Sequence, residues 1–332
     1  MYFIAEIGVN HNGDMNFAKK LIDLAKESGA NAVKFQLFKA DRLALKKTPK
    51  TRYQIEAEGD SDSHHEMLKR LEVNIDQLKD LSDYCAKKSI DFLCTPYDQI
   101  AAQELFEIGC KNFKTASADL VDYFLHKYLA KVADSVIISV GMSTMGEIED
   151  CLKLYENSSC KVILLHCVTN YPCSDESMNL KTIGTLQSSF GLPVGLSDHS
   201  EGSVASVIAS SMGCDYVEKH FTEDKNLYGP DHRASATPHE FKMLVDDVKK
   251  AELQLGSSVK KVRDEEVNML KISRKSIFAS IDIESGEIFS EANLKLSRPG
   301  GGLHPMLVQR ILGMKATRKI LQDEQVKFGD FE

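Results

Sequence analysis

Short apolar runs alternate with longer amphipathic segments along the first 255 residues of the chain. The apolar runs are rich in β-branched and aromatic residues, which favours strands. The longer segments repeat apolar side chains at helical spacing, as Phe17, Leu21, Leu24 and Ala25 do. The pattern therefore predicts eight strands alternating with helices, with the strands at residues 2–7, 32–38, 90–95, 112–115, 135–140, 161–167, 192–200 and 215–221.

Eight strand–helix units in this length predict a TIM (β/α)8 barrel, because repeated units of this kind form a parallel sheet that can close. An open doubly wound sheet is the alternative fold, which is weakened because no G-x-G-x-x-G sequence follows the first strand. A polar stretch from residue 39 to about residue 63 is longer than an ordinary connection between a strand and a helix. We expect this stretch to be a functional or mobile loop.

The pattern changes after Gly256, where a charged tract reaches about Lys271. Short strands then follow at residues 275–281 and 294–296, separated by turn-rich sequence. We therefore expect a barrel domain at residues 1–256, a linker at 257–273 and a small β-rich domain at 274–332. A domain of about 60 residues has a modest core, so docking or dimerisation would stabilise it.

Composition narrows the class of protein. The 332 residues are 42% hydrophobic and 27% charged, as in ordinary soluble proteins, and the net charge of -8 argues against nucleic acid or an anionic membrane as the main partner. With neither a signal peptide nor a long apolar run in view, we expect a cytoplasmic protein. The eight cysteines form no C-x-x-C pair and are expected to be reduced core thiols, although a catalytic Cys167 beside His166 is an alternative.

Polar side chains recur at the carboxyl ends of the predicted strands, which is where the active site of an eightfold barrel forms. Any one of them has a structural explanation, since a buried lysine is usually paired and a strand-end serine often caps a helix. Together they predict a site for an anionic small molecule, such as one with a phosphate and a carboxylate. The residues are Glu6, Lys34, Gln36, Thr95, Tyr97, Lys114, Ser117, Asp119, Ser139, His166, Thr169, Tyr171, Ser197, His199 and His220.

His199 and His220 end the last two predicted strands. If these strands are parallel neighbours, the two imidazoles meet at one end of the sheet, because side chains alternate between the faces of a strand. Histidine is the commonest ligand of divalent transition metals, so a metal site is one interpretation. A pair of hydrogen-bonded histidines with no metal is the other.

Eight short motifs, in order along nearly the whole chain, resemble the sialic acid (nonulosonic acid) synthase family. No single motif is specific, but the set is. The motifs are residues 5–13 (AEIGVNHNG), 33–36 (VKFQ), 94–96 (CTP), 166–172 (HCVTNYP), 195–199 (GLSDH), 218–221 (EKHF), 229–232 (GPDH) and 298–300 (RPG).

The resemblance implies a TIM barrel followed by an antifreeze-like SAF domain in a domain-swapped homodimer. It also implies a transferase that condenses phosphoenolpyruvate with an N-acylated mannosamine-type sugar, giving a nine-carbon 2-keto acid and phosphate. N-acetylneuraminate is the first expected product. Legionaminate or pseudaminate, made from a 2,4-diacetamido-trideoxyhexose, is the alternative.

The same resemblance implies roles for individual residues. Glu6 would handle protons, and His199 and His220 would hold Mn2+ or Mg2+. The residues implied for phosphoenolpyruvate are Lys34, Thr95, Lys114, Ser117, Ser139 and Ser197. Those implied for the sugar are Gln36, Tyr97, Thr169, Tyr171, Asp231 and Arg298, the last acting on the partner subunit's barrel.

The chain departs from the family pattern at three positions near the site. Asp119 replaces the usual glutamate and follows Ala118 where a glycine is common, which leaves its role open. Val140 replaces a threonine, and Thr169 stands where some relatives have asparagine, so the sugar is not fixed. Two other classes remain, namely a metal-independent Schiff-base aldolase using Lys34 or Lys114 and a binding protein that has kept the fold.

Overall fold

The computed structural model describes residues 1–59 and 61–332 and divides the chain into two compact units, Met1–Gly256 and Ser257–Glu332. Each unit has a hydrophobic cluster of its own. Within the described residues, no helix has both the length and the apolar character needed to cross a bilayer.

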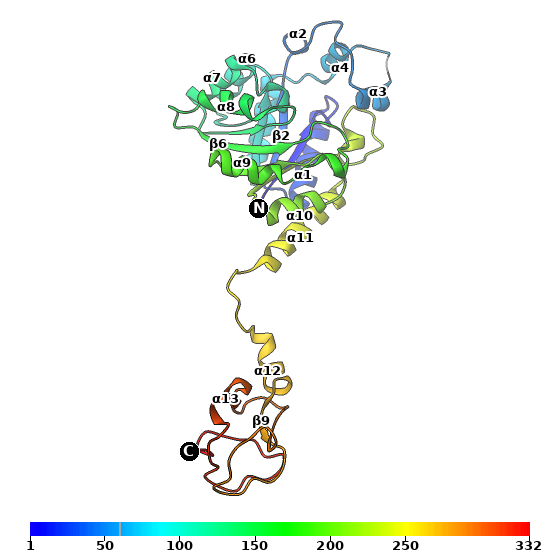
Figure 1. The fold of residues 1–332 in the computed structure, drawn as a ribbon. Coiled ribbons are helices and arrows are strands. Elements are labelled where there is room, and N and C mark those ends of the chain that lie inside the picture. The colour runs from blue at the N-terminus through cyan, green and yellow to red at the C-terminus, as the bar shows by residue number, and fades with distance from the viewer. Residues whose placement is uncertain (60) are drawn as a thin grey trace. The chain divides into compact units, whose positions relative to one another are not determined.

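The first unit is a closed barrel of eight parallel strands, coloured from blue to yellow-green in Figure 1. Neighbouring strands are consecutive in the chain, and β8 pairs with β1 to close the sheet. This confirms the predicted TIM barrel. The strands are β1 (Tyr2–Gly8), β2 (Ala32–Leu37), β3 (Asp91–Pro96), β4 (Asn112–Thr115), β5 (Ser135–Ser139), β6 (Lys161–Cys167), β7 (Val194–Ser197) and β8 (Tyr216–His220).

Helices with one apolar face alternate with the strands. In α1, the Asp14 carboxylate accepts hydrogen bonds from the first free amides, and Leu21, Ile22 and Ala25 are buried. The helices that follow the strands are α1 (Met15–Glu27), α5 (Ile75–Lys88), α6 (Gln99–Glu107), α7 (Tyr123–Val132), α8 (Met145–Lys153), α9 (Thr182–Phe190), α10 (Val204–Ser211) and α11 (Pro238–Leu255), and three-residue 3-10 turns occur at η1 (Ser117–Asp119), η2 (Asp175–Ser177) and η3 (His232–Ala234).

The polar stretch after β2 is not simply a long loop. It contains α2 (Ala40–Leu43) and α3 (Arg52–Glu58), and α4 (His64–Leu71) follows directly. Thr51 with Gln54, and Ser63 with Glu66, form capping boxes that start α3 and α4. Both boxes are visible in the sequence as T-x-x-Q and S-x-x-E, so the expectation of a functional or mobile loop overlooked a local signal for helices.

Alternation along the strands divides the barrel interior into an apolar layer and a polar layer. Ile4 and Ile137 belong to an interior apolar cluster, and two residues further on, Glu6 and Ser139 occupy the same faces. Glu6 is in register with Lys34 on one side and with His220 on the other. The charged groups therefore gather at the carboxyl ends of the strands.

The second unit is small and has little regular structure. Strands β9 (Ser276–Ala279) and β10 (Leu294–Ser297) form an antiparallel pair where short strands were predicted. Ile277, Phe289 and Ile320 are fully buried in its hydrophobic cluster. Its other elements are η4 (Asp264–Glu266), α12 (Val267–Ser273), η5 (Pro305–Leu307) and α13 (Val308–Ile311).

Candidate active site

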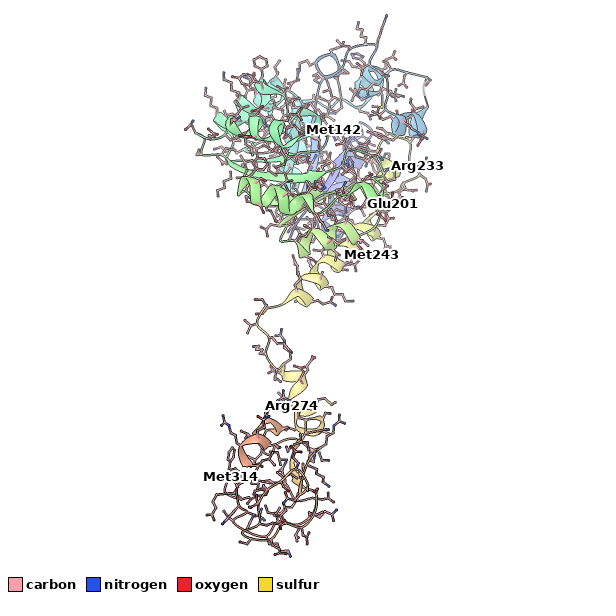
Figure 2. The ribbon with its side chains drawn as sticks, viewed as in Figure 1. Met142, Glu201, Arg233, Met243, Arg274 and Met314 are labelled. Atoms are coloured by element: carbon pink, nitrogen blue, oxygen red, sulfur yellow. The ribbon has the colours of Figure 1, made fainter. Side chains whose placement is uncertain are left out.

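A cavity of about 690 Å³ lies in the first unit at the carboxyl ends of the strands, within the size range of small-molecule sites. Met142, an exposed residue in the turn after β5 that is labelled in Figure 2, is one of the residues that line it. The cavity is lined by most of the residues that the sequence predicted, namely Glu6, Lys34, Gln36, Tyr97, Lys114, Ser117, Asp119, Ser139, Thr169, Tyr171, Ser197, His199, His220 and Asp231.

Thr95 was also predicted as a site residue but is not among the residues that line the cavity, and Arg298, predicted to act on the partner subunit's barrel, belongs to the second unit. The buried Thr95 hydroxyl accepts a hydrogen bond from Lys34 Nζ at 3.0 Å, which orients the lysine. Arg298 is an exposed residue that follows β10 in the second unit.

Two lysines and two glutamates form a buried charge cluster at the base of the cavity. Lys34 Nζ lies 2.7 Å from Glu6 Oε2 and 3.8 Å from Glu218 Oε1, and Lys114 Nζ lies 3.2 Å from the same Glu218 oxygen. All four side chains are almost inaccessible to solvent. Glu218 was not predicted as a site residue, although its place on the same strand face as His220 was a usable signal in the sequence.

The two glutamates of this charge cluster have opposite pKa shifts. Burial raises the pKa of Glu6, and the nearby Glu218 adds to the rise, against the effect of Lys34. Burial also opposes ionisation of Glu218, but Lys114 and Lys34 outweigh it and hold the pKa of Glu218 below its usual value. Glu6 is therefore the carboxyl group that can carry a proton, while Glu218 stays ionised.

The imidazoles of His199 and His220 are neighbours, with ring centroids 5.6 Å apart. Val168 O lies 2.9 Å from His199 Nδ1, which leaves the other nitrogen of that ring directed at Ser197 Oγ, 3.4 Å away. Burial and the charge of His199 hold the pKa of His220 well below its usual value, so its ring is neutral. His220 Nδ1 is buried and has no hydrogen-bond partner among residues 1–59 and 61–332.

These two histidines fit a metal ion that takes its remaining ligands from substrate or water. A neutral imidazole with an unpartnered buried nitrogen is a suitable ligand, and a histidine that binds a metal commonly donates its other ring N–H to a backbone carbonyl, as His199 does to Val168. In residues 1–59 and 61–332, no group of three or more His, Cys, Asp or Glu residues is arranged to hold a metal.

Cys167 contacts His199 and not its sequence neighbour His166. Its Sγ lies 3.8 Å from His199 Nδ1, and the imidazole lowers the pKa of the thiol to about 7 despite the opposing effect of burial. His166 Nε2 lies 2.7 Å from Met178 O, within hydrogen-bond distance. The suggested pairing of Cys167 with His166 is therefore wrong, because the two side chains point to opposite faces of β6.

Two aspartates with raised pKa values also line the cavity. Burial, with Asp122 adding, raises the pKa of Asp119 to about 7, and one of its carboxylate oxygens has no hydrogen-bond partner in the part of the chain that the structure describes. Burial and Glu6 raise the pKa of Asp231 to about 7, and its carboxylate lies 4.0 Å from His220 Nδ1. Either group can donate or accept a proton near neutral pH.

The loop that carries Asp231 is held by asparagines of the N-H-N-G motif. Asn10 Nδ2 donates to Ser235 Oγ at 2.9 Å, and Ser235 Oγ donates to the Asp231 carbonyl at 2.6 Å. Asn12 Nδ2 donates to the Tyr228 carbonyl at 2.8 Å. The motif therefore fixes the position of the loop that carries Asp231.

Tyr53 of α3 closes one side of the cavity and was missed in the sequence. Its ring centroid lies 5.0 Å from that of Tyr171, whose ring in turn lies 4.1 Å from His199. The only indication available from the sequence was the unusual length of the segment between β2 and α5.

Comparison with known proteins places the chain in a family. Residues 21–260 match the NeuB family and residues 274–332 match the SAF domain. The chain is 41% identical to the N,N'-diacetyllegionaminic acid synthase of Campylobacter jejuni, over 98% of each chain. It is 40% identical to the protein of the same name from Legionella pneumophila, over 96% of this chain and 91% of that one.

Comparison with a solved structure agrees with this family. The N-acetylneuraminic acid (sialic acid) synthetase of Leptospira borgpetersenii, crystallised with citrate, superposes with a TM-score of 0.71 at 33% identity, over 81% of this chain and 90% of that one. The chain, with its TIM barrel and its SAF domain, belongs to the NeuB family.

Proposed function

We propose that this protein condenses phosphoenolpyruvate with a 2,4-diacetamido-2,4,6-trideoxyhexose, giving N,N'-diacetyllegionaminate and phosphate. The names of the relatives that are 41% and 40% identical support this acceptor over N-acetylmannosamine, the first expectation from the sequence. Pseudaminic acid synthases are also among the relatives, at 33% identity or below.

The buried charge cluster is the observation that carries the reaction class. Lys34 and Lys114 are held in place by carboxylates before substrate arrives, so they can accept the phosphate and carboxylate of phosphoenolpyruvate without reorganising. The hydroxyls of Ser117, Ser139 and Ser197 line the same cavity and supply further donors. Ser139 Oγ has no hydrogen-bond partner among the described residues, as expected of a group that binds substrate.

The acceptor sugar would lie beside this charge cluster, along Gln36, Tyr97, Thr169, Tyr171 and Asp231. Gln36 Nε2 donates to Glu6 Oε1 at 2.7 Å, so it holds the acid in position as well as facing the sugar. A divalent metal bound by His199 and His220 would supply Lewis-acid polarisation of the aldehyde of the open-chain sugar.

Glu6 would act first as a general acid and then as a general base. Carbon 3 of phosphoenolpyruvate attacks the aldehyde carbon, and protonated Glu6 gives its proton to the aldehyde oxygen as that oxygen becomes a hydroxyl. Water then adds to carbon 2, which has become cationic, and the Glu6 carboxylate takes a proton from that water. Breaking the bond between carbon 2 and the phosphate oxygen releases phosphate, which takes the remaining proton of the carbon 2 hydroxyl, and leaves the keto acid.

The SAF domain would complete the site in a homodimer, with Arg298 of one copy binding the N-acyl group of the sugar in the barrel of the other. The support for this assembly is the family resemblance and the presence of an SAF domain at residues 274–332.

Phosphate release tests the proposal directly. The purified protein is mixed with phosphoenolpyruvate and either the diacetamido-trideoxyhexose or N-acetylmannosamine, with and without Mn2+. We expect metal-dependent release, faster with the diacetamido sugar, and its loss in His199→Ala and His220→Ala. No release with any N-acylated hexosamine would refute the reaction class, and full activity in either histidine variant would refute the metal site.

A Schiff-base aldolase is the weaker candidate. Burial tends to lower the pKa of Lys34, but Glu218 and Glu6 outweigh it and keep the pKa above its usual value. A protonated amine is not a nucleophile, so Lys34 is poorly suited to form an imine. Covalent trapping with borohydride and substrate would reverse this conclusion.

A further inference from the structure

Two charged residues lie next to the proposed metal ligands in the chain but have no role in the proposed reaction. Asp198 precedes His199 in the G-L-S-D-H motif. Lys219 precedes His220 in the E-K-H-F motif. Because side chains alternate along a strand, Asp198 and Lys219 point away from the cavity, and neither is among the described residues that line it. Both are nevertheless buried, with 0% of the Asp198 side chain and 6% of the Lys219 side chain exposed, so their charges must be satisfied inside the protein.

The Asp198 carboxylate is bound from three elements. Its Oδ1 accepts from the amide and the hydroxyl of Ser200, at 2.9 and 2.7 Å, in the turn after β7. Its Oδ2 accepts from Ser206 Oγ of α10 at 2.7 Å and lies 3.1 Å from Lys219 Nζ of β8. One carboxylate therefore connects the end of β7 to β8 and to the helix that packs between them.

Lys219 contacts the chain on both sides of His199. Its Nζ pairs with Asp198 and also donates to the Ser200 carbonyl at 2.6 Å. His199 thus lies between the two residues that a single ammonium group binds. That ammonium belongs to the residue directly before His220. The backbone positions of the two histidines are therefore tied to each other.

The strand pairing alone leaves His199 beyond the end of the sheet. Strand β7 ends at Ser197, which pairs with Glu218 of β8, and His199 follows two residues later. His220, by contrast, is in register with Glu6 of β1. The contacts of the Asp198–Lys219 pair continue the connection between β7 and β8 past the last residue of β7.

The other contacts of His199 lead to a different strand. The Cys173 amide donates to the His199 carbonyl at 2.8 Å, and the Val168 carbonyl lies 2.9 Å from Nδ1. Both partners belong to the loop after β6, so they do not set the distance to β8. A buried ion pair adds little stability over well-packed apolar side chains, so the contribution of the Asp198–Lys219 pair is the geometry that it fixes.

We propose that Asp198 and Lys219 are positioning residues for the metal, whose ion pair sets the separation of the His199 and His220 rings and thereby the affinity for a divalent cation. This inference rests on the proposed function, because it concerns the metal site proposed there. Replacing residues that orient metal ligands costs roughly 10- to 100-fold in metal affinity.

Binding of Mn2+ in the absence of substrates tests the proposal. The electron paramagnetic resonance signal of free Mn2+ gives the Kd in the wild-type protein, in Lys219→Met and in Asp198→Asn, which keep the length of the original side chains. We expect the Kd for Mn2+ to rise at least tenfold in each variant. His220→Ala should abolish binding, which shows that the measured ion is bound at the histidines.

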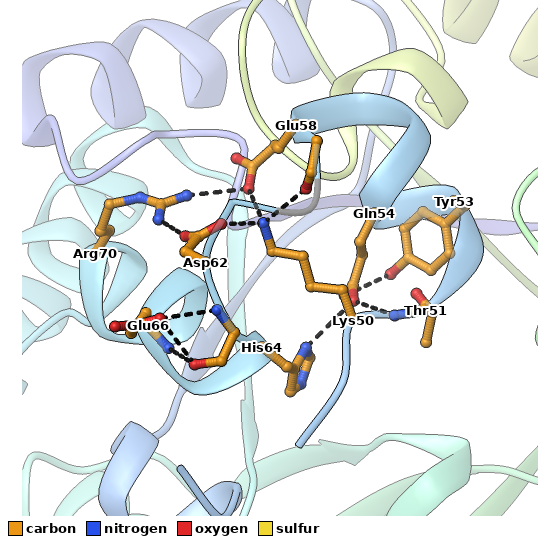
Figure 3. A network of polar contacts seen from close by, with 11 residues as sticks. Lys50, Thr51, Tyr53, Gln54, Glu58, Asp62, His64, Glu66 and Arg70 are labelled. Atoms are coloured by element: carbon orange, nitrogen blue, oxygen red, sulfur yellow. Dashed lines mark hydrogen bonds and ion pairs between the residues drawn. The ribbon is translucent and has the colours of Figure 1, made fainter. Parts of the chain in front are cut away.

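A second buried lysine provides the matched control (Figure 3). Lys50 Nζ is fully buried, donates to the Gly59 carbonyl at 3.1 Å and pairs with Asp62. Arg70 pairs with Asp62 as well and lies 3.0 Å from Glu58. Lys50, Glu58, Asp62 and Arg70 are here called the buried ion network, which belongs to the segment after β2 and not to β7 or β8. Lys50→Met makes the same substitution as Lys219→Met and should leave the Kd for Mn2+ unchanged.

Binding of phosphoenolpyruvate without metal distinguishes positioning of the histidines from a general loosening of the barrel. The lysines proposed to bind it belong to β2 and β4, so its Kd, measured from the ligand-induced rise in Tm, should stay at the wild-type value in Lys219→Met and Asp198→Asn. A parallel rise in the Kd for phosphoenolpyruvate and for Mn2+ would overturn the proposal, because the pair would then support the whole barrel.

A milder variant keeps the proposal testable if a charge variant does not fold. Ser206→Ala removes one donor from the Asp198 carboxylate and leaves no charge unpaired, so it should raise the Kd for Mn2+ by roughly threefold. The wild-type Kd for Mn2+ in every folded variant of Asp198, Lys219 and Ser206 would overturn the proposal. A wild-type protein that binds no Mn2+, or binding that survives in His220→Ala, would instead refute the metal site of the proposed function, and this inference with it.

Discussion

Replacing Glu218 with glutamine should make the empty protein less stable and its affinity for phosphoenolpyruvate higher. Glu218 is shared by two buried lysines, at 3.2 Å from Lys114 and 3.8 Å from Lys34. In the described residues it is the sole carboxylate within 4.0 Å of Lys114. Glu218→Gln therefore leaves the Lys114 ammonium buried without a counter-charge.

The expected cost follows from the burial of the pair. Breaking a buried ion pair by removing one partner costs about 3–5 kcal/mol, and the lower figure applies here because glutamine keeps a polar contact. For a unit of this size, about 3 kcal/mol lowers the Tm by roughly 6 °C or more. Substrate should reverse the effect, because an anion about 8 Å from the lost carboxylate is relieved of about 2 kcal/mol of repulsion at an effective dielectric constant of about 20.

Thermal unfolding with and without phosphoenolpyruvate, at constant Mn2+, measures both effects. We expect a lower Tm for Glu218→Gln alone and a larger rise in Tm on adding phosphoenolpyruvate than in the wild-type protein, equivalent to a Kd about 30-fold lower. Glu201→Gln removes an exposed carboxylate and is the matched control. An unchanged Tm without ligand, or a ligand-induced rise no greater than that of the wild type, would refute the assigned role of the charge cluster.

Three further predictions concern other parts of the chain. Arg298→Ala should raise the KM for the sugar at least tenfold and leave the KM for phosphoenolpyruvate unchanged. Steady-state kinetics with an unchanged KM for the sugar would exclude the role of Arg298 in sugar binding. Burial lowers the pKa of His11 and of His126 to about 4, so the unfolded chain binds these protons first as the pH falls below about 6.5. Each histidine should then cost about 2 kcal/mol of unfolding free energy at pH 5 relative to pH 7.5, which urea titrations would show as a midpoint that falls with pH, and a constant midpoint would contradict it. Lys50→Met should remove one of the cations that pair with Glu58 and Asp62 and leave Arg70 as their described partner. Amide hydrogen exchange in α3 and α4 should then be faster than in the wild-type protein, while the barrel strands stay protected. The same exchange rates in the variant and the wild type would show that the ion network is dispensable.

The barrel and much of its site were predictable because they depend on local periodicity. The alternation that buries Ile4 also turns Glu6 into the barrel, and the same rule places Lys34, Ser139 and His220. Closure of the sheet then brings these residues together, since each lies at the carboxyl end of its strand. No information about distant parts of the chain was required.

Other contacts depend on register and on the path of the chain, which periodicity does not specify. Cys167 reaches His199 because β6 and β7 pair with Cys167 opposite Ser197. Tyr53 reaches Tyr171 because capping boxes and a buried ion network fold the segment after β2 back over the cavity. Asp231 was found from a motif alone, since it lies in a loop that carries no strand pattern.

The tyrosines and cysteines all lie in the first unit, so spectroscopic signals can distinguish the two units. All ten tyrosines and all eight cysteines lie between residues 2 and 228, and the chain has no tryptophan. Tyrosine emission and thiol labelling therefore report on the barrel alone, whereas far-ultraviolet circular dichroism reports on both units. Any difference between the melting curves from the two signals would belong to the SAF domain, so its unfolding can be followed without a label or a truncation.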